Sequence, residues 1–147
     1  MKVNKLDKKE RNLMKFITKN LSEIKDIIEY NKSLKFTDYD KNIEEIGRSK
    51  NIVILGNFDG IHKGHKIILE KAVKKAKEKN LKTIVYTFSE YPKNRQNKIT
   101  TCSEKAYLLN ENKIDYLYLE EFEKVRNYSP EEFVEKVIVN ILNASEV

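Results

Sequence analysis

Cysteine, proline, glycine and tryptophan are scarce in this 147-residue chain, which has one, two, four and none of them respectively. The single cysteine, Cys102, excludes an internal disulfide and a zinc site built from several cysteines, and it is typical of a reducing compartment. The chain begins with charged residues, and no apolar run reaches the roughly 7–15 residues of a signal peptide or the roughly 20 of a membrane span. We therefore expect a cytoplasmic protein with no membrane partner.

The length and charge favour one domain without a nucleic-acid partner. A chain of 147 residues can bury roughly 68–70% of its unfolded surface, so it needs no disulfide or structural metal to fold. The net charge of +6 would suit an anionic partner. However, the densest lysine cluster, residues 71–79, falls on the predicted exposed face of one helix. No aromatic RNA-binding signature lies among these lysines, so we expect no nucleic acid.

Residues 1–50 are predicted to form a charged helical extension followed by a connector. Apolar residues recur there at helical spacing, which predicts one or two amphipathic helices with a single apolar stripe: Leu13, Ile17, Leu21, Ile24 and Ile28. We expect residues 1–34 to pack against the domain or to mediate self-association. Residues 35–50 show little periodicity, and we expect a connector there with a short helix at 43–46.

From residue 51 to the end, strand and helix patterns alternate. The predicted strands are 52–55, 83–88, 114–119 and the approach to a fourth at 144–147. The predicted helices are 65–79, 103–112 and one that follows Ser129. A strand, a helix of about four turns and another strand make a right-handed crossover between parallel strands. We therefore predict an α/β domain with a parallel sheet over residues 51–147.

Two of these helices carry clear start signals, and two have a predicted buried face. Thr101-x-x-Glu104 and Ser129-Pro-Glu-Glu132 are capping boxes, the second with proline at the first helical position. Helix 65–79 is predicted to bury Ile68, Leu69, Ala72, Val73 and Ala76. The last helix is predicted to bury Phe133, Val134, Val137, Ile138, Ile141 and Leu142.

Three of the four glycines and both histidines lie in residues 56–65, between the first predicted strand and its helix. Ligands of parallel α/β sheets bind at the carboxyl ends of the strands. Gly56 and Gly60 would let the backbone turn sharply and come close to a ligand, and Gly64 would do the same at the helix start. The helix N-terminus would offer unpaired N–H groups to an anion. This stretch therefore predicts a phosphate-binding turn.

His62 and His65 are three residues apart, so a helical turn places both rings on one side of the chain. Two imidazole donors would stabilise charge on phosphate oxygens during nucleotidyl transfer from a triphosphate to a phosphate acceptor, which needs no general base. Mg²⁺ would be held mostly by the phosphates. The histidines have no evident third partner for zinc, so we predict no protein metal site. Asp59 either contacts the ligand or only caps the turn.

The run Gly56-Asn-Phe-Asp-Gly-Ile-His-Lys-Gly-His65 resembles the signature of prokaryotic-type FAD synthetases, Gly-x-Phe-Asp-Gly-Val-His-x-Gly-His. The wider nucleotidyltransferase superfamily shares only His-x-Gly-His and an earlier glycine. Gly60 after Asp59 favours the FAD synthetase branch over cytidylyltransferases and pantetheine-phosphate adenylyltransferases. Two more runs are similar to family segments: Thr87-Phe-Ser-Glu-Tyr-Pro92 to Thr-Phe-Asp-Pro-His-Pro, and Tyr128-Ser-Pro-Glu-Glu-Phe-Val134 to Leu-Ser-Pro-Glu-Glu-Phe.

The resemblance implies a Rossmann-like nucleotidyltransferase fold and an FMN adenylyltransferase, which makes FAD and pyrophosphate from FMN and magnesium-bound ATP. It implies that His62 and His65 are catalytic. It implies ATP contacts from Gly56, Asn57, Phe58, Asp59, Gly60, His62, Gly64 and His65. It implies flavin contacts from Thr87, Phe88, Tyr91 and Pro92, although Ser89, Glu90 and Tyr91 replace the usual Asp, Pro and His.

Later segments of the family do not occur in this sequence. These are Val-Gly-x-Asp-Phe-x-Phe-Gly, the phosphate-holding Ser-Ser-Thr-x-x-Arg and the riboflavin kinase module. We therefore expect an adenylyltransferase-like domain that is incomplete at its C-terminal end. The alternatives are another nucleotidyltransferase of the cytidylyltransferase type and a non-catalytic nucleotide-binding or interaction fragment.

Overall fold

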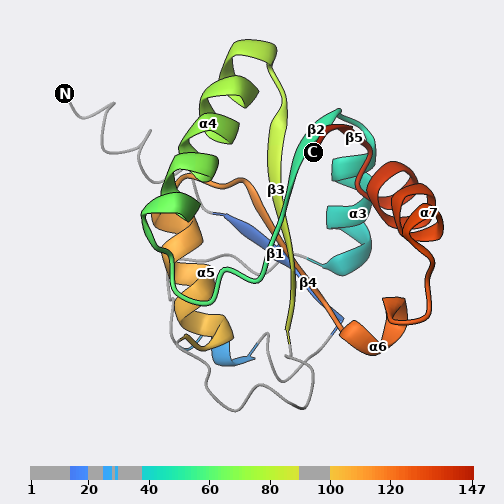
Figure 1. Cartoon of the computed structure of the whole chain (residues 1–147), viewed down its shortest axis with the longest axis horizontal. Helices are drawn as coiled ribbons and strands as arrows, with labels where there is room; N and C mark the ends of the chain where they lie inside the picture. Colours follow the sequence, from blue (N-terminus) through green and yellow to red (C-terminus); the bar gives the residue numbers. More distant parts are fainter. Residues whose placement is uncertain (1–13, 20–24, 28, 30–37, 90–99) are drawn as a thin grey trace.

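The computed structural model describes residues 14–19, 25–27, 29, 38–89 and 100–147 (Figure 1). Its strands form one all-parallel sheet in the order β1-β4-β3-β2-β5, which confirms the predicted α/β fold. The strands are β1 (Lys15–Ile17), β2 (Asn51–Leu55), β3 (Lys82–Phe88), β4 (Tyr116–Glu120) and β5 (Ala144–Glu146). The helices are α3 (Tyr39–Gly47), α4 (Lys63–Lys79), α5 (Cys102–Glu111), α6 (Phe122–Val125) and α7 (Pro130–Phe133), which continues as the π-helix η1 (Val134–Ile141).

Helices cover both faces of the sheet, with α4 and α5 on one side and α3 and α7 on the other (Figure 1). Successive strand residues point to opposite faces, so each strand contributes to two cores. On β3, Val85 packs in the core with α4 and α5, whereas Tyr86 packs in the core with α3 and η1. On β4, Leu117 and Tyr118 divide in the same way.

The strand order reverses at β2. The chain passes from β2 to β3 and then to β4 on one side, and returns to place β5 on the other side of β2. Ligands of such sheets bind outside the carboxyl ends of the strands at the point of reversal. The residues that follow Leu55, the last residue of β2, therefore occupy the expected ligand position.

The predicted capping boxes are both present. The Thr101 hydroxyl accepts a hydrogen bond from the Glu104 N–H at 3.2 Å, and Glu104 accepts one from the Thr101 N–H at 2.7 Å. Ser129 and Glu132 make the same exchange, at 3.1 and 2.9 Å. These local signals explain why the starts of α5 and α7 are predictable from sequence.

Two predicted core positions are wrong. Ile68 is 53% exposed and Val134 is 52% exposed. Helix α4 packs on the sheet through Leu69, Ala72 and Ala76, whereas Ile68 faces solvent. After Phe133 the helix continues as a π-helix, whose wider turn buries Val137 and Ile138 and leaves Val134 outside.

The helix predicted across Lys15–Ile17 is wrong, because this segment is the edge strand β1. It pairs in parallel with β4, with Phe16 opposite Leu117 and Ile17 opposite Tyr118. Phe16 and Ile17 are both buried, one in each core, and a helical stripe through Ile17 alone would have left Phe16 outside. Alternating burial of neighbours is the strand pattern.

Part of the N-terminal prediction stands and part lies outside the described residues. Residues 25–27 and 29 are helical, whereas Leu13, Leu21, Ile24 and Ile28 lie outside the described ranges. The short helix predicted at 43–46 is longer, because Asp38 caps its start by accepting a hydrogen bond from the Asp40 N–H at 2.8 Å. Within the described ranges, no helix combines the length and apolar composition needed to cross a bilayer.

Candidate active site

The loop between β2 and α4 has an unusual backbone, which is fixed by packing of Phe58. Phe58 has a φ of 49° and Gly60 a φ of 76°, both in the left-handed region. That conformation costs a bulky residue roughly 1–3 kcal/mol and persists only where its surroundings hold it. The Phe58 ring is buried and lies where a side chain on Gly56 would be, since an added Cβ would come 2.7 Å from its Cε2. Gly56 therefore makes room for Phe58.

His62 and His65 stack on each other at the start of α4. Their ring centroids are 3.7 Å apart with an interplanar angle of 20°. The Nδ1 atom of His62 accepts hydrogen bonds from the N–H groups of Gly64 at 3.1 Å and His65 at 3.4 Å. These two N–H groups were expected to be open to an anion, but His62 already caps them.

The hydrogen bonds also assign the proton on each ring. Because His62 Nδ1 accepts, a neutral His62 carries its proton on Nε2 and can donate it to an anion. His65 Nδ1 lies 3.1 Å from the carbonyl oxygen of Gly60, which can only accept, so His65 carries a proton on Nδ1. His65 can therefore donate from Nε2 only as an imidazolium. The two histidines are brought together as predicted, but they are not equivalent donors.

Asp59 ties the loop to the start of α5. One oxygen of its carboxylate accepts hydrogen bonds from the Thr100 N–H at 2.8 Å and the Thr100 hydroxyl at 3.1 Å. The Gly60 N–H donates in turn to the Thr100 hydroxyl oxygen at 3.2 Å. This geometry favours the interpretation that Asp59 holds the turn.

Among the described residues, no group of three or more His, Cys, Asp or Glu could hold a metal ion.

The segment predicted to contact flavin is divided between the two faces of the sheet. Thr87 is buried on the side of α5, and its hydroxyl donates to the carbonyl oxygen of Asn57 at 3.2 Å. Phe88 lies on the other side, in edge-to-face contact with Phe122 at a centroid distance of 5.2 Å. Tyr91 and Pro92 lie outside the described residues.

An apolar cavity of about 410 Å³ adjoins the loop at Gly56 and Asn57. Its walls include the aromatic rings of Phe88, Phe122 and Phe133. Aromatic walls with few polar groups suit a planar ring system. Sequence reasoning missed Phe122 as a site residue because nothing local marks it. Phe133 lay in a recognised run but was predicted only as a buried helix residue.

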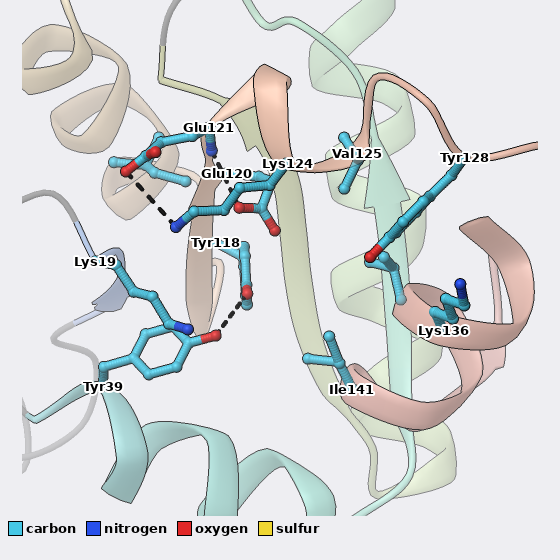
Figure 2. Close-up of a pocket in the computed structure, with 12 residues that line it drawn as sticks. Lys19, Tyr39, Tyr118, Glu120, Glu121, Lys124, Val125, Tyr128, Lys136 and Ile141 are labelled. Atoms are coloured by element: carbon cyan, nitrogen blue, oxygen red, sulfur yellow. Dashed lines mark hydrogen bonds and ion pairs between the residues drawn. The ribbon is translucent and has the colours of Figure 1, made fainter. Parts of the chain in front are cut away.

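A second, more polar cavity of about 200 Å³ lies at the carboxyl end of β4 (Figure 2). The Tyr39 and Tyr118 hydroxyl groups are 2.8 Å apart at one side of it. Glu120 ends β4, and burial raises the pKa of its carboxyl, against the lowering effects of the Glu121 N–H and Lys124. Val125 and Tyr128 line both cavities, which are therefore neighbours. Sequence reasoning singled out neither Glu120 nor this cavity.

The all-parallel sheet, with a histidine-bearing loop where the strand order reverses, has the α/β fold of the nucleotidyltransferase class. Residues 44–147 match the FAD synthetase family. The chain belongs to the FAD synthetase family. This agrees with the resemblance seen in residues 56–65.

Similar proteins are about three times as long as the region that they share with this chain. The bifunctional riboflavin kinase/FMN adenylyltransferase of Buchnera aphidicola subsp. Schizaphis graminum is 31% identical over 109 residues, which cover 69% of this chain and 35% of that protein. The Bacillus subtilis protein of the same name is 29% identical over 102 residues, 64% of this chain and 32% of its own. The chain therefore spans about a third of the length of these curated relatives.

A solved structure also resembles the chain. It is described as a macrolide-efflux protein from Streptococcus pneumoniae, with a TM-score of 0.57 and 31% sequence identity. The alignment covers 65% of this chain and 34% of that one. It supports the assigned fold over the matched part.

Proposed function

We propose that this chain transfers the AMP group of magnesium-bound ATP to FMN, giving FAD and pyrophosphate. The observation that carries the proposal is the stacked His62–His65 pair, set within the family motif beside an aromatic cavity that opens at Gly56 and Asn57. The histidines supply donors for phosphate oxygens, and the cavity supplies a place for the flavin. The proposed sites for the two substrates thus lie next to each other at the carboxyl end of β2.

In this reaction an oxygen of the FMN phosphate forms a bond to the α-phosphorus of ATP. The bond from that phosphorus to the bridging oxygen breaks, and its electron pair leaves with pyrophosphate. The acceptor is already an anion, so neither histidine has to remove a proton. His62 can donate from Nε2 with a neutral ring, whereas His65 can donate from Nε2 only when both of its ring nitrogens carry a proton. Mg²⁺ would enter with ATP and would be held mainly by the phosphates.

The aromatic cavity is proposed to hold the isoalloxazine ring. Phe88, Phe122 and Phe133 would stack on it or meet its edges. Thr87 supports the loop instead of touching the flavin, because its hydroxyl is engaged with Asn57. Gly56, Asn57, Gly60 and Gly64 are proposed to let ATP approach the backbone, and Phe58 and Asp59 hold that backbone in place.

The test is FAD formation from FMN, ATP and Mg²⁺, followed by liquid chromatography. Removal of one well-placed phosphate donor typically lowers kcat by roughly 10²–10³. We therefore expect the kcat of His65→Ala to be lower than that of the parent by this factor. Lys71→Ala, an exposed position on α4, is the matched control and should keep parental activity. Equal rates for the parent and His65→Ala would refute the catalytic assignment.

Calorimetry with ATP and CTP separates the alternatives. Preference for CTP would favour a cytidylyltransferase, and nucleotide binding without turnover would favour a non-catalytic module. We also propose that residues 1–50 and 51–147 form separate units, that the protein is cytoplasmic, and that residues 1–34 mediate self-association. Cell fractionation tests the location, and light scattering tests the self-association.

A further inference from the structure

Helix α5 carries a buried lysine next to the motif loop. Lys105 is 1% exposed, among the apolar residues Ala106 and Leu109 of the same helix. Lysine is almost never fully buried unless its amino group is held by polar partners. An ordinary core position would carry an aliphatic side chain. The burial of Lys105 therefore calls for a reason other than packing.

Its amino group reaches the loop through one side chain. The Lys105 Nζ donates to the Thr87 hydroxyl oxygen at 3.5 Å, and the Thr87 hydroxyl donates to the Asn57 carbonyl oxygen at 3.2 Å. The first bond is at the long end of the hydrogen-bond range. A cation at the head of such a chain polarises the hydroxyl and strengthens its bond to the carbonyl. Lys105, Thr87 and Asn57 thus connect three elements: α5, the end of β3 and the loop.

This series of hydrogen bonds ends at Asn57, beside the strained residue of the loop. Asn57 directly precedes Phe58, whose φ of 49° is held only by its surroundings. On the other side of Phe58, Asp59 is tied to Thr100 at the start of α5. One hydrogen-bonded connection starts at Lys105 in α5 and the other at Thr100, two residues before that helix, and they meet the loop on either side of Phe58. Only the first of them passes through Lys105.

We propose that Lys105 is a positioning residue for the nucleotide loop. Through Thr87 it fixes the Asn57 carbonyl, and so holds the loop in the conformation that places His62 and His65. When its amino group is protonated, Lys105 also adds a positive charge behind the Asn57 carbonyl, which favours binding of a polyphosphate at the loop. The part that concerns ATP rests on the proposed function, whereas the part that concerns the loop does not.

The test compares variants that break the chain with one that keeps it. Lys105→Met and Thr87→Val preserve size and remove a donor, whereas Thr87→Ser keeps the hydroxyl. Lys71→Met makes the same chemical change at an exposed site of α4. Three quantities are measured for each variant: the thermal midpoint, the exchange rates of the Gly56 and Gly60 amides, and kcat and KM for ATP. The Gly56 and Gly60 amides are informative because they donate to Tyr86 and Thr100.

Lys105→Met and Thr87→Val are each expected to speed exchange of these two amides at least roughly tenfold, beyond any change in α4 amides. Their kcat/KM for ATP should fall roughly tenfold or more, and the double variant should be no worse than either, because the residues act in series. Thr87→Ser should keep the parental exchange rates and the parental kcat/KM for ATP, because the hydroxyl is retained. Lys71→Met should change neither quantity.

Unchanged exchange of the loop amides in Lys105→Met and Thr87→Val would overturn the proposal, even if both variants melt earlier. Faster exchange with unchanged kcat/KM would overturn its ATP part. If the parent makes no FAD, the proposed function fails, and the exchange rates alone decide whether Lys105 positions the loop.

Discussion

At the scale of single residues, substitution of Gly56 tests whether packing of Phe58 fixes the shape of the loop. A Cβ added there would lie 2.7 Å from Cε2 of Phe58, so Gly56→Ala must displace a buried ring. We expect the free energy of unfolding to fall by about 1–3 kcal/mol, the usual cost of overpacking. Urea unfolding measures it. Gly47→Ala is the matched control, because a Cβ there meets nothing within 4 Å and helical alanine is favoured over glycine. Equal stability of both variants would show that Phe58 does not pack over Gly56.

Glu120 gives a pH-dependent prediction. Burial raises the pKa of its carboxyl above the unfolded value, so the folded protein binds this proton more tightly than the unfolded chain. Stability is then lost as the pH rises from the unfolded pKa through the folded pKa. We expect Glu120→Gln to melt at a higher temperature than the parent at pH 7. The difference should vanish below about pH 4, where glutamate is neutral in both states.

The exposed residue Glu123 provides the comparison for this measurement, because Glu123→Gln changes a carboxylate that faces solvent. Its melting temperature should stay close to that of the parent across the same pH range. A Glu120→Gln variant less stable than the parent at pH 7 would mean that Lys19 and Lys124 stabilise the ionised carboxylate more than burial opposes it.

At the scale of elements, the edge strand β1 is the feature that distinguishes this structure from a helical extension. Phe16 is buried against the α4 and α5 side of the sheet, whereas the helical stripe through Ile17 would leave it exposed. Phe16→Ala should therefore cost about 3–5 kcal/mol of unfolding free energy. Lys15→Ala, whose partner Glu45 is half exposed, should cost less than about 1 kcal/mol. If guanidinium unfolding shows that Phe16→Ala also costs less than about 1 kcal/mol, the burial of Phe16 in strand β1 is contradicted.

Elements with local signals were predictable from the sequence. Residues 52–55 and 83–88 show strand composition, and Thr101 and Ser129 mark helix starts by capping. β1 was not predictable, because three residues carry no period of their own and the strand is held by β4, about 100 residues later. The same limit applies to the site. The histidine pair was evident from spacing, but the cap that His62 makes, the opposite faces of Thr87 and Phe88 and the aromatic wall at Phe122 depend on tertiary contacts.

At the scale of the whole molecule, the fold brings the histidine motif and the aromatic cavity to the same edge of the sheet. The histidine motif follows the strand at which the sheet order reverses, and the aromatic cavity lies beside it. The matched relatives are about three times as long as the region they share with this chain. What this length of chain can do by itself is therefore the central experimental question.

The most direct measurement follows the label of ATP during incubation of the chain with FMN and Mg²⁺. With ATP labelled at the α-phosphate, adenylyl transfer places the label in FAD, and with ATP labelled at the γ-phosphate it places the label in pyrophosphate alone. His65→Ala should reduce the first signal without altering which product carries it. Absence of labelled FAD from the parent, or transfer of the γ-label to a flavin, would contradict adenylyl transfer by this site.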